Sequence, residues 1–203
     1  MIGIIDYGMG NLRSVENALH KLKVDCVITS QKEVLDQCQK WILPGVGAFP
    51  DCISNLKKMD LFDYIKDSVN NGKPLLGICL GMQTLFEYST EMEYCQGFGF
   101  IKGNIQLMED LNVRIPHIGW NQLEKNQDHD IYSILGHEPY VYFVHSYYAQ
   151  DYEDKDLIGY SVYGDLKICG LVQHKNVLGC QFHPEKSAED GLKILKYFVE
   201  DFV

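Results

Sequence analysis

Leu75-Leu76-Gly77-Ile78-Cys79-Leu80-Gly81 is an apolar run that ends in a cysteine flanked by glycines. The run is typical of a buried strand, and residues 82–88 have a helical pattern. A Gly-x-Cys-x-Gly sequence between a strand and a helix matches the nucleophile elbow, a tight turn that presents a reactive side chain. Small neighbours are needed because larger ones would clash with the closing backbone. A helix that begins beside the sulfur favours the reactive thiolate. We therefore predict an α/β fold with Cys79 as nucleophile, and a buried strand cysteine before an ordinary turn is the alternative.

The first half of the chain repeats this rhythm of strand and helix. Helical patterns separate short β-rich runs, which predicts a parallel sheet covered by helices. The predicted strands are residues 2–6, 26–29, 41–43 and 75–79.

The second half has more strand than helix. Strand-like runs follow one another until a helix closes the chain at residues 189–202, so we expect antiparallel pairing at one side of a mixed sheet. No repeat or linker divides the sequence, and we predict a single domain over residues 1–203. The strand-like runs are residues 140–144, 157–163, 168–172 and 177–182.

Composition excludes several classes of protein. The 203 residues include 18 Lys+Arg and 28 Asp+Glu, which gives a net charge of -10 and disfavours binding to nucleic acid. No apolar run approaches the ~20 residues that span a bilayer. The first residues contain no basic segment or cleavage site of a secretory signal, so we expect a cytoplasmic protein.

The cysteines and glycines indicate neither a metal nor a cofactor. The seven cysteines are scattered without a CxxC pair, so neither a disulfide framework nor a zinc site is predicted. Gly8-Met9-Gly10-Asn11 lacks the third glycine of a dinucleotide-binding loop, and we interpret it as a structural turn. We expect no cofactor and no metal ion.

A second chemical motif, His183-Pro184-Glu185, follows a run that resembles a buried strand. Residues two apart in an extended segment point to the same side, so the carboxylate of Glu185 can orient the imidazole of His183. His183 would then exchange protons with Cys79, as in a Cys-His-Glu triad. The other six histidines show no such partner in the sequence. An isolated His-Pro-Glu would more often be structural, but it occurs here together with the elbow.

Attack of a thiolate on an amide or ester creates an oxyanion that needs hydrogen-bond donors. One predicted donor is the backbone N–H of Leu80, directly after the nucleophile. The other is the turn Pro44-Gly45-Val46-Gly47, where we select Val46 and Gly47. A peptide next to glycine rotates easily, so binding elsewhere could aim or withdraw this donor. A simple sharp loop after a strand is the alternative.

Six blocks in order over essentially the whole chain resemble class I glutamine amidotransferases, and among them the glutaminase subunits of imidazole glycerol phosphate synthases. The resemblance implies a flavodoxin-like fold with a mixed, mostly parallel sheet, flanking helices and an antiparallel edge. The blocks are Asp6-Tyr7-Gly8-Met9-Gly10-Asn11, Pro44-Gly45-Val46-Gly47-Ala48-Phe49, Gly77-Ile78-Cys79-Leu80-Gly81-Met82-Gln83, Pro116-His117-Ile118-Gly119-Trp120-Asn121, Tyr142-Phe143-Val144-His145-Ser146-Tyr147 and Phe182-His183-Pro184-Glu185-Lys186-Ser187.

The resemblance also implies a reaction and its site. Cys79 would attack the side-chain amide of glutamine, ammonia would leave with a proton from His183, and water would release glutamate from the thioester. An acid after the elbow holds the amino-acid end of the substrate; we select Glu91, while Glu87 and Glu93 remain alternatives. The implied glutamine-binding residues are Gly45, Gln83, Glu91, His145, Ser146 and Tyr147.

The resemblance further implies a partner, the (β/α)₈ cyclase subunit, which receives ammonia through an internal channel in a heterodimer of histidine biosynthesis. We expect weak glutaminase activity alone and strong activation by the partner with its nucleotide bound. The implied residues of the partner face and ammonia exit are Asn11, Trp120, Asn121, Tyr142 and Lys186.

Three other functions remain open at this stage. A paralogous glutaminase could supply ammonia to a sugar amidotransferase, and the catalytic motifs do not distinguish it. An independent α/β cysteine hydrolase is disfavoured by Gln83, Glu91 and the block at residues 116–121. An inert binding module is disfavoured by the intact Cys79, His183 and Glu185. The sequence does not identify the synthase that accepts the ammonia.

Overall fold

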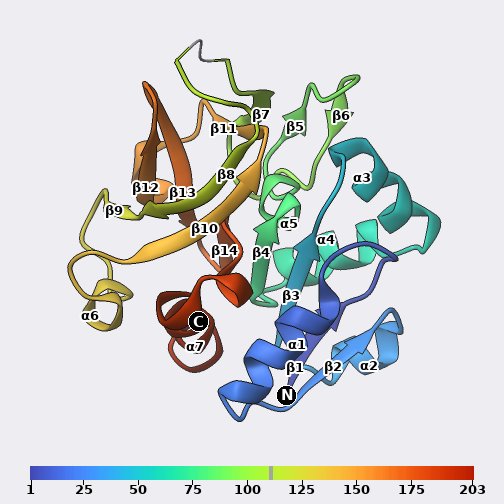
Figure 1. Cartoon of the computed structure of the whole chain (residues 1–203). Coiled ribbons are helices and arrows are strands. Elements are labelled where there is room, and N and C mark those ends of the chain that lie inside the picture. Colours follow the sequence, from blue (N-terminus) through green and yellow to red (C-terminus); the bar gives the residue numbers. More distant parts are fainter. Residues whose placement is uncertain (110–111) are drawn as a thin grey trace.

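The computed structural model describes residues 1–109 and 112–203, and an eight-stranded sheet forms its centre (Figure 1). The strands lie in the order β2-β1-β3-β4-β14-β13-β12-β9. Their bounds are β1 Ile2–Ile5, β2 Cys26–Thr29, β3 Lys40–Gly45, β4 Leu75–Cys79, β14 Val177–Cys180, β13 Leu166–His174, β12 Leu157–Tyr163 and β9 Glu124–Lys125.

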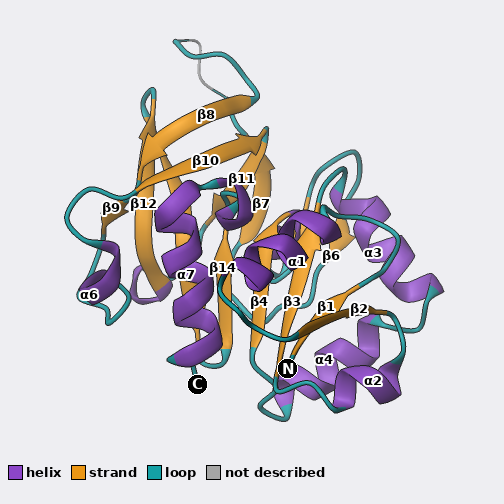
Figure 2. Ribbon diagram, turned by 60° about the horizontal axis from the view of Figure 1, so that its bottom comes forward, coloured by secondary structure: helices purple, strands orange, loops and turns teal. Residues whose placement is uncertain are grey.

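Helices cover both faces of this sheet (Figure 2). Strand residues alternate between two apolar cores: Ile4 and Ile42 belong to one, and Ile5 and Leu43 to the other. This alternation follows from the two-residue period of a strand, and it explains why the strands are buried on both faces. The first core includes α1 Leu12–Lys21 and α7 Ala188–Glu200, and the second includes α2 Lys32–Asp36, α3 Phe49–Lys58 and α4 Phe62–Asn70.

The mixed sheet that the sequence predicts is confirmed, including its antiparallel edge. Strands β2, β1, β3, β4 and β14 are parallel, and β13, β12 and β9 continue the sheet in antiparallel pairs. The carboxyl ends of the parallel strands therefore lie at one edge, where open α/β sheets bind their ligands.

One predicted strand lies outside this sheet. Residues 140–144 were expected in the mixed sheet, but β10 (Tyr140–His145) pairs with β8 (His117–Gln122) in a two-stranded sheet of its own. Val141 and Phe143 are buried, whereas Tyr140 is exposed and Tyr142 half-buried. This one-sided burial suits a strand that lies over the core rather than within it.

A four-stranded sheet lies next to the carboxyl edge of the central one (Figure 1). Its order is β11-β7-β5-β6, and the sequence analysis did not predict it as a sheet. The bounds are β11 Tyr147–Gln150, β7 Asn104–Leu107, β5 Tyr88–Ser89 and β6 Cys95–Gln96.

The prediction of a helix at residues 82–88 is wrong. Helix α5 (Leu80–Gln83) has only four residues. The carbonyls that would continue it accept hydrogen bonds from a later segment instead: Phe98 N–H donates to Thr84 at 2.8 Å, and Gly97 N–H donates to Glu87 at 2.8 Å. Tertiary contacts thus override the local helical pattern. The other short elements are α6 Tyr132–Leu135 and the 3₁₀ turns η1 Asp154–Asp156 and η2 Pro184–Lys186.

Among the helices of the described residues, none combines the length and the apolar character that a membrane span requires. The fold places the end of β4, and with it Cys79, at the edge where open α/β sheets bind their ligands.

Candidate active site

Cys79 ends β4 in the strained turn that the Gly-x-Cys-x-Gly sequence predicts. Its φ of 53° and ψ of -110° are unfavourable for a residue with a side chain and cost about 1–3 kcal/mol. A Cβ atom on Gly81 would overlap the carbonyl oxygen of Leu43, and one on Gly77 would lie 2.7 Å from the oxygen of Gly81. Glycine at both positions therefore lets the chain fold back tightly enough to present the sulfur.

The elbow opens into a cavity of about 270 Å³ at the carboxyl edge of the sheet. Most of the predicted site residues line this cavity, although they come from five separate segments of the chain. The lining residues are Val46, Gly47, Cys79, Leu80, Gln83, Glu91, Val144, His145, Ser146, Tyr147 and His183.

His183 and Glu185 form a buried pair in this region. The Nδ1 atom of His183 lies 2.8 Å from Oε1 of Glu185, and the two side chains are 2% and 1% exposed. The expectation that both lie in an extended segment is wrong, because Glu185 lies in the 3₁₀ turn η2. The hydroxyl of Ser187 fixes this turn by donating to the carbonyl of His183 at 2.7 Å.

The pair leaves the second nitrogen of His183 free for chemistry. Because Nδ1 donates to a carboxylate, Nε2 is the atom available to Cys79; among the described residues this buried nitrogen has no hydrogen bond of standard geometry. Burial alone would lower the pKa of His183. Interactions with Cys79 and Glu185 outweigh burial and raise the pKa to about 10. His183 thus carries a proton at neutral pH, close enough to Cys79 to interact with it.

The predicted oxyanion residues lie beside the sulfur. Strand β3 pairs with β4 so that Gly45 lies opposite Cys79, and this register brings the turn after β3 to the elbow. Val46, Gly47 and Leu80 all line the cavity. Gly47 has a φ of 99°, which favours glycine. Their role as oxyanion donors stays a prediction.

The predicted glutamine-binding residues are also at the cavity, except Gly45. Glu91 is at the cavity, whereas Glu87 accepts a hydrogen bond from Gly103 N–H and does not line it. One oxygen of Glu91 accepts from Phe49 N–H at 2.7 Å, at the first residue of α3. Burial raises the pKa of Glu91 above its ordinary value, although this hydrogen bond opposes the shift.

Within residues 1–109 and 112–203, Gln83 uses both protons of its amide in hydrogen bonds, and its oxygen makes none. Its Nε2 donates to the carbonyl of Tyr147 at 2.9 Å and to Oε1 of Gln181 at 3.1 Å, which uses both amide protons. The Oε1 atom of Gln83 and the second oxygen of Glu91 are therefore acceptors, and they suit a ligand ammonium group. No group of three or more His, Cys, Asp or Glu side chains suited to a metal ion occurs in residues 1–109 and 112–203.

Comparison with known proteins agrees with this geometry. The family model described as "Glutamine amidotransferase class-I" matches residues 3–202. The chain belongs to the class I glutamine amidotransferase family. Two relatives named "Imidazole glycerol phosphate synthase subunit HisH" are each 48% identical to this amidotransferase. The one from Bacillus cereus aligns over 98% of this chain and 93% of its own, and the one from Lactococcus lactis over 98% of both.

Solved structures share the fold of this amidotransferase at low sequence identity. One described as a glutamine amidotransferase has a TM-score of 0.77 and 20% identity, over 98% of this chain and 97% of its own. The structure of PurLQS from Thermotoga maritima has a TM-score of 0.73 and 20% identity, over 98% of this chain and 96% of its own. These likenesses confirm the predicted fold class.

The predicted partner-face residues of the amidotransferase lie on β8, β10 and η2 and directly before α1. Trp120 on β8 is 50% exposed and pairs in register with Tyr142 on β10, with ring centroids 6.0 Å apart. Asn121 follows on β8. Lys186 lies in η2, which contacts α1, and Asn11 precedes that helix.

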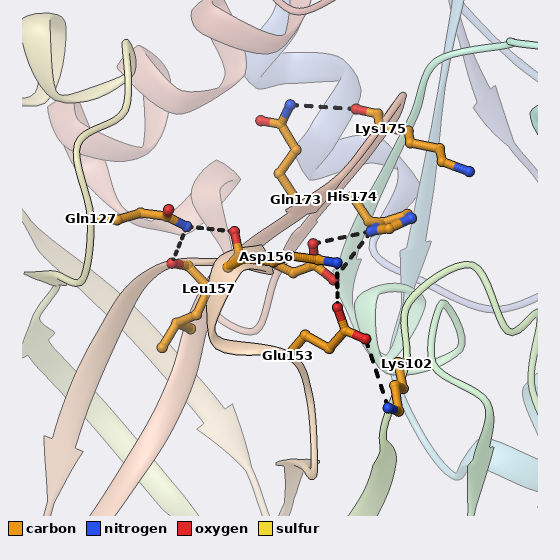
Figure 3. A network of polar contacts seen from close by, with 9 residues as sticks. Lys102, Gln127, Glu153, Asp156, Leu157, Gln173, His174 and Lys175 are labelled. Carbon is orange, nitrogen blue, oxygen red and sulfur yellow. Dashed lines mark hydrogen bonds and ion pairs between the residues drawn. The ribbon is translucent and has the colours of Figure 1, made fainter.

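Sequence reasoning missed two further features. It found no carboxylate partner for the other histidines, yet His174 Nδ1 lies 3.0 Å from Asp156 in a polar network (Figure 3). This network lies near Val177, at the end of β14 opposite the catalytic edge. Gln181 also carries no signal in the sequence; it is fully buried with its Nε2 3.9 Å from Sγ of Cys79. Neither contact joins neighbours in the sequence.

Proposed function

We propose that this chain is the glutaminase subunit of an imidazole glycerol phosphate synthase. One observation carries the proposal: Cys79 and His183 share a cavity with acceptors for an ammonium group, in a chain 48% identical over nearly its full length to subunits of that name. We further propose that residues 1–203 form one domain.

The geometry supports a two-step reaction at Cys79. The sulfur attacks the side-chain amide carbon of glutamine, and the backbone N–H groups of Leu80 and the turn at residues 45–47 stabilise the oxyanion. The amide nitrogen takes the proton of His183 and leaves as ammonia. Neutral His183 then deprotonates water, which hydrolyses the thioester and releases glutamate. Glu185 keeps Nε2 of His183 directed at these groups.

The residues around the cavity suit the rest of the substrate. Glutamine carries an α-ammonium group, and the free oxygens of Gln83 and Glu91 accept its protons. Residues 145–147 form part of the same wall. A carboxylate and an amide oxygen at this position favour an amino acid over a peptide, whose amide nitrogen carries neither a charge nor spare protons.

The proposed partner is a (β/α)₈ cyclase subunit that docks on the outward face of β8 and β10. This face exposes Ile118, Trp120 and Tyr140, and large aromatic residues dominate the energies of interfaces. Val144 follows on the same face of β10 and lines the catalytic cavity. The docking surface therefore continues into the site where ammonia forms. Direct transfer would prevent protonation of ammonia in bulk water.

The proposal includes a cytoplasmic location. All seven cysteines are unpaired, and four of them besides Cys79 are fully buried, which agrees with a reducing compartment.

The test uses the complex of this chain with a cyclase subunit and compares two nitrogen sources. We expect Cys79→Ala to abolish product formation from glutamine and to preserve it when ammonium is supplied. Loss of both activities would contradict the division of labour between the subunits. If the wild-type chain hydrolyses glutamine but neither binds the cyclase nor supports its reaction, the chemistry stands and the acceptor is a different synthase, such as a sugar amidotransferase.

A further inference from the structure

A continuous series of hydrogen bonds leads from the partner face to the sulfur of Cys79. Its first link is on β8, where Oδ1 of Asn121 lies 2.8 Å from Nε2 of His117. Nδ1 of His117 lies 3.0 Å from Nε2 of His145, and Nδ1 of His145 lies 2.9 Å from the carbonyl of Tyr147. Both imidazoles are buried.

The series continues through two amide side chains. The carbonyl of Tyr147 also accepts Nε2–H of Gln83, which donates to Oε1 of Gln181 as well. Nε2 of Gln181 then donates to Sγ of Cys79 at 3.9 Å. Gln83 and Gln181 are 5% and 0% exposed, so water does not compete for these bonds.

We propose that Gln181 and His117 are positioning residues of the glutaminase site, members of one hydrogen-bonded chain that joins Asn121 at the partner face to Sγ of Cys79. The proposal deepens the proposed function and rests on it for the reaction concerned. Gln181 presents an N–H donor to the thiolate, and its orientation is fixed because Gln83 holds its oxygen. His117 fixes the far end of the chain.

The number of protons on the two imidazoles makes this series of hydrogen bonds sensitive to the contacts of Asn121. The carbonyl of Tyr147 and Oδ1 of Asn121 are both acceptors, so Nδ1 of His145 and Nε2 of His117 must each carry a proton. The hydrogen bond between the two rings needs a third proton. Two neutral rings carry only two protons. Burial lowers the pKa of His117, and it lowers that of His145 to about 3, so the pair is neutral.

The neutral pair is satisfied when the amide of Asn121 turns and donates from Nδ2 to His117. Asn121 then loses its 3.3 Å bond to the carbonyl of Val162, and its oxygen needs another donor. A donor from a docked partner meets this need, so docking fixes the direction of the bonds between Asn121 and the carbonyl of Tyr147, where the chain meets Gln83. The titratable groups that face the pair are Tyr163, whose ring stacks on His117 at 4.0 Å, and His183, which lowers the pKa of His145.

The experiment measures alkylation of Cys79 by iodoacetamide across a pH series in the full chain, with peptide mass spectrometry to identify the labelled cysteine. Gln181→Glu keeps the acceptor for Gln83 but replaces the donor to sulfur by a carboxylate oxygen. We expect alkylation at neutral pH to fall about tenfold or more and the midpoint of the pH profile to rise. Gln181→Met removes the donor without adding charge, and we expect a smaller fall in the same direction. Rates within about twofold of wild type in both variants would overturn the proposal.

A double-mutant cycle tests whether the far end is coupled. We expect Asn121→Ala and His117→Phe each to slow alkylation about threefold in the wild-type background and to have no further effect in Gln181→Glu. Asn121→Asp offers His117 an acceptor only, which the neutral pair cannot satisfy, and it should not restore the rate. Gln122→Ala, on the same strand, is the matched control. The coupling would be overturned if each variant slowed alkylation of Cys79 by the same factor in wild type and in Gln181→Glu. It would also be overturned if neither variant changed the rate.

This assay uses neither glutamine nor the cyclase. If the coupling is absent and glutamate release is normal, the proposed hydrogen-bonded series is rejected and the proposed function stands. If the coupling is present in a protein that does not hydrolyse glutamine, only the proposed function is rejected.

Discussion

His183 and His145 line the same cavity, yet their surroundings move their pKa values in opposite directions. Burial and the nearby histidines lower the pKa of His145 to about 3, whereas interactions with Cys79 and Glu185 overcome burial and raise that of His183 to about 10. Such a separation is typical of sites that assign different roles to chemically equal groups. In our account, His183 holds the proton for the leaving group and His145 stays neutral.

These shifts predict how stability depends on pH. An unfolded histidine takes up a proton near pH 6.5, but folded His145 stays neutral down to about pH 3, so the folded state loses stability as the pH falls from 6.5 towards 3. The raised pKa of His183 has the opposite sign: its contribution is complete below 6.5 and is lost as the pH rises through about 10.

We expect His145→Gln to reduce the slope of unfolding free energy on the acid side, and urea unfolding at a series of pH values measures it. His183→Gln should remove the loss of stability on the alkaline side and have a smaller effect on the acid side, because His183 is only one of the causes that lower the pKa of His145. An unchanged acid slope in His145→Gln would contradict the buried neutral state of this ring.

Individual residues were predictable when their chemistry depended on neighbours in the sequence. Cys79 was found from its two glycines, and His183 from Glu185 two positions later. Gln181 and His117 were not found, because their partners lie 98 and 28 positions away for the bonds to Gln83 and His145. Nothing in the sequence near either residue marks these contacts.

At the scale of elements, the elbow depends on close approach between α5 and β3. We expect Gly81→Ala to destabilise the chain by about 3 kcal/mol or more, since its Cβ would meet the backbone oxygen of Leu43, which cannot move without breaking the strand. Gly3→Ala is the control, because its Cβ would meet only side-chain atoms of Leu35, Cys38 and Trp41 at 3.0–3.1 Å. Denaturant unfolding compares them, and equal losses would argue against the tight elbow.

A second prediction concerns Glu91, which joins the β5–β6 connection to the first turn of α3. We expect Glu91→Gln to raise KM for glutamine about tenfold with a smaller effect on kcat, because a neutral amide attracts the α-ammonium group less. The raised pKa of Glu91 also predicts that KM rises on acidification at a higher pH than for an ordinary glutamate. Steady-state kinetics test both. Glu93 is exposed, and Glu93→Gln should have the KM of the wild type. If Glu93→Gln raised KM and Glu91→Gln did not, the substrate contact would be at Glu93.

The errors at this scale have a common cause. Residues 82–88 have a helical pattern, but the segment at 97–103 takes the hydrogen bonds of the second half. Residues 140–144 have the composition of a strand in the central sheet, but they pair with β8 above it. In both cases the local pattern does not contain the distant segment that takes the hydrogen bonds.

For the whole molecule, the central claim about assembly concerns the exposed face of β8 and β10. We expect Trp120→Ala to weaken binding to the cyclase subunit by at least about thirtyfold, as for a central aromatic anchor, without changing the unfolding free energy by more than about 1 kcal/mol. Calorimetric titration of the two subunits measures it. Met59→Ala, at the far end of α3, should bind normally. Unchanged affinity in Trp120→Ala would place the interface elsewhere.

The overall architecture was the most predictable level. Alternating strands and helices, followed by strands without helices, correctly indicated a mixed sheet with an antiparallel edge. The four-stranded sheet was not predicted, because strands as short as Tyr88–Ser89 and Cys95–Gln96 leave no periodic signal. The two-stranded sheet was missed for another reason, because residues 140–144 were expected to pair within the central sheet. These sheets nevertheless carry the proposed docking face and one wall of the cavity.

The most direct test of the account is glutamate release from glutamine by the purified chain, with and without a cyclase subunit and its nucleotide substrate. We predict slow release by the chain alone, strong activation by the loaded partner, and loss of all release in Cys79→Ala. Release that persists in Cys79→Ala, or full activity of the isolated chain that the partner does not change, would contradict the account.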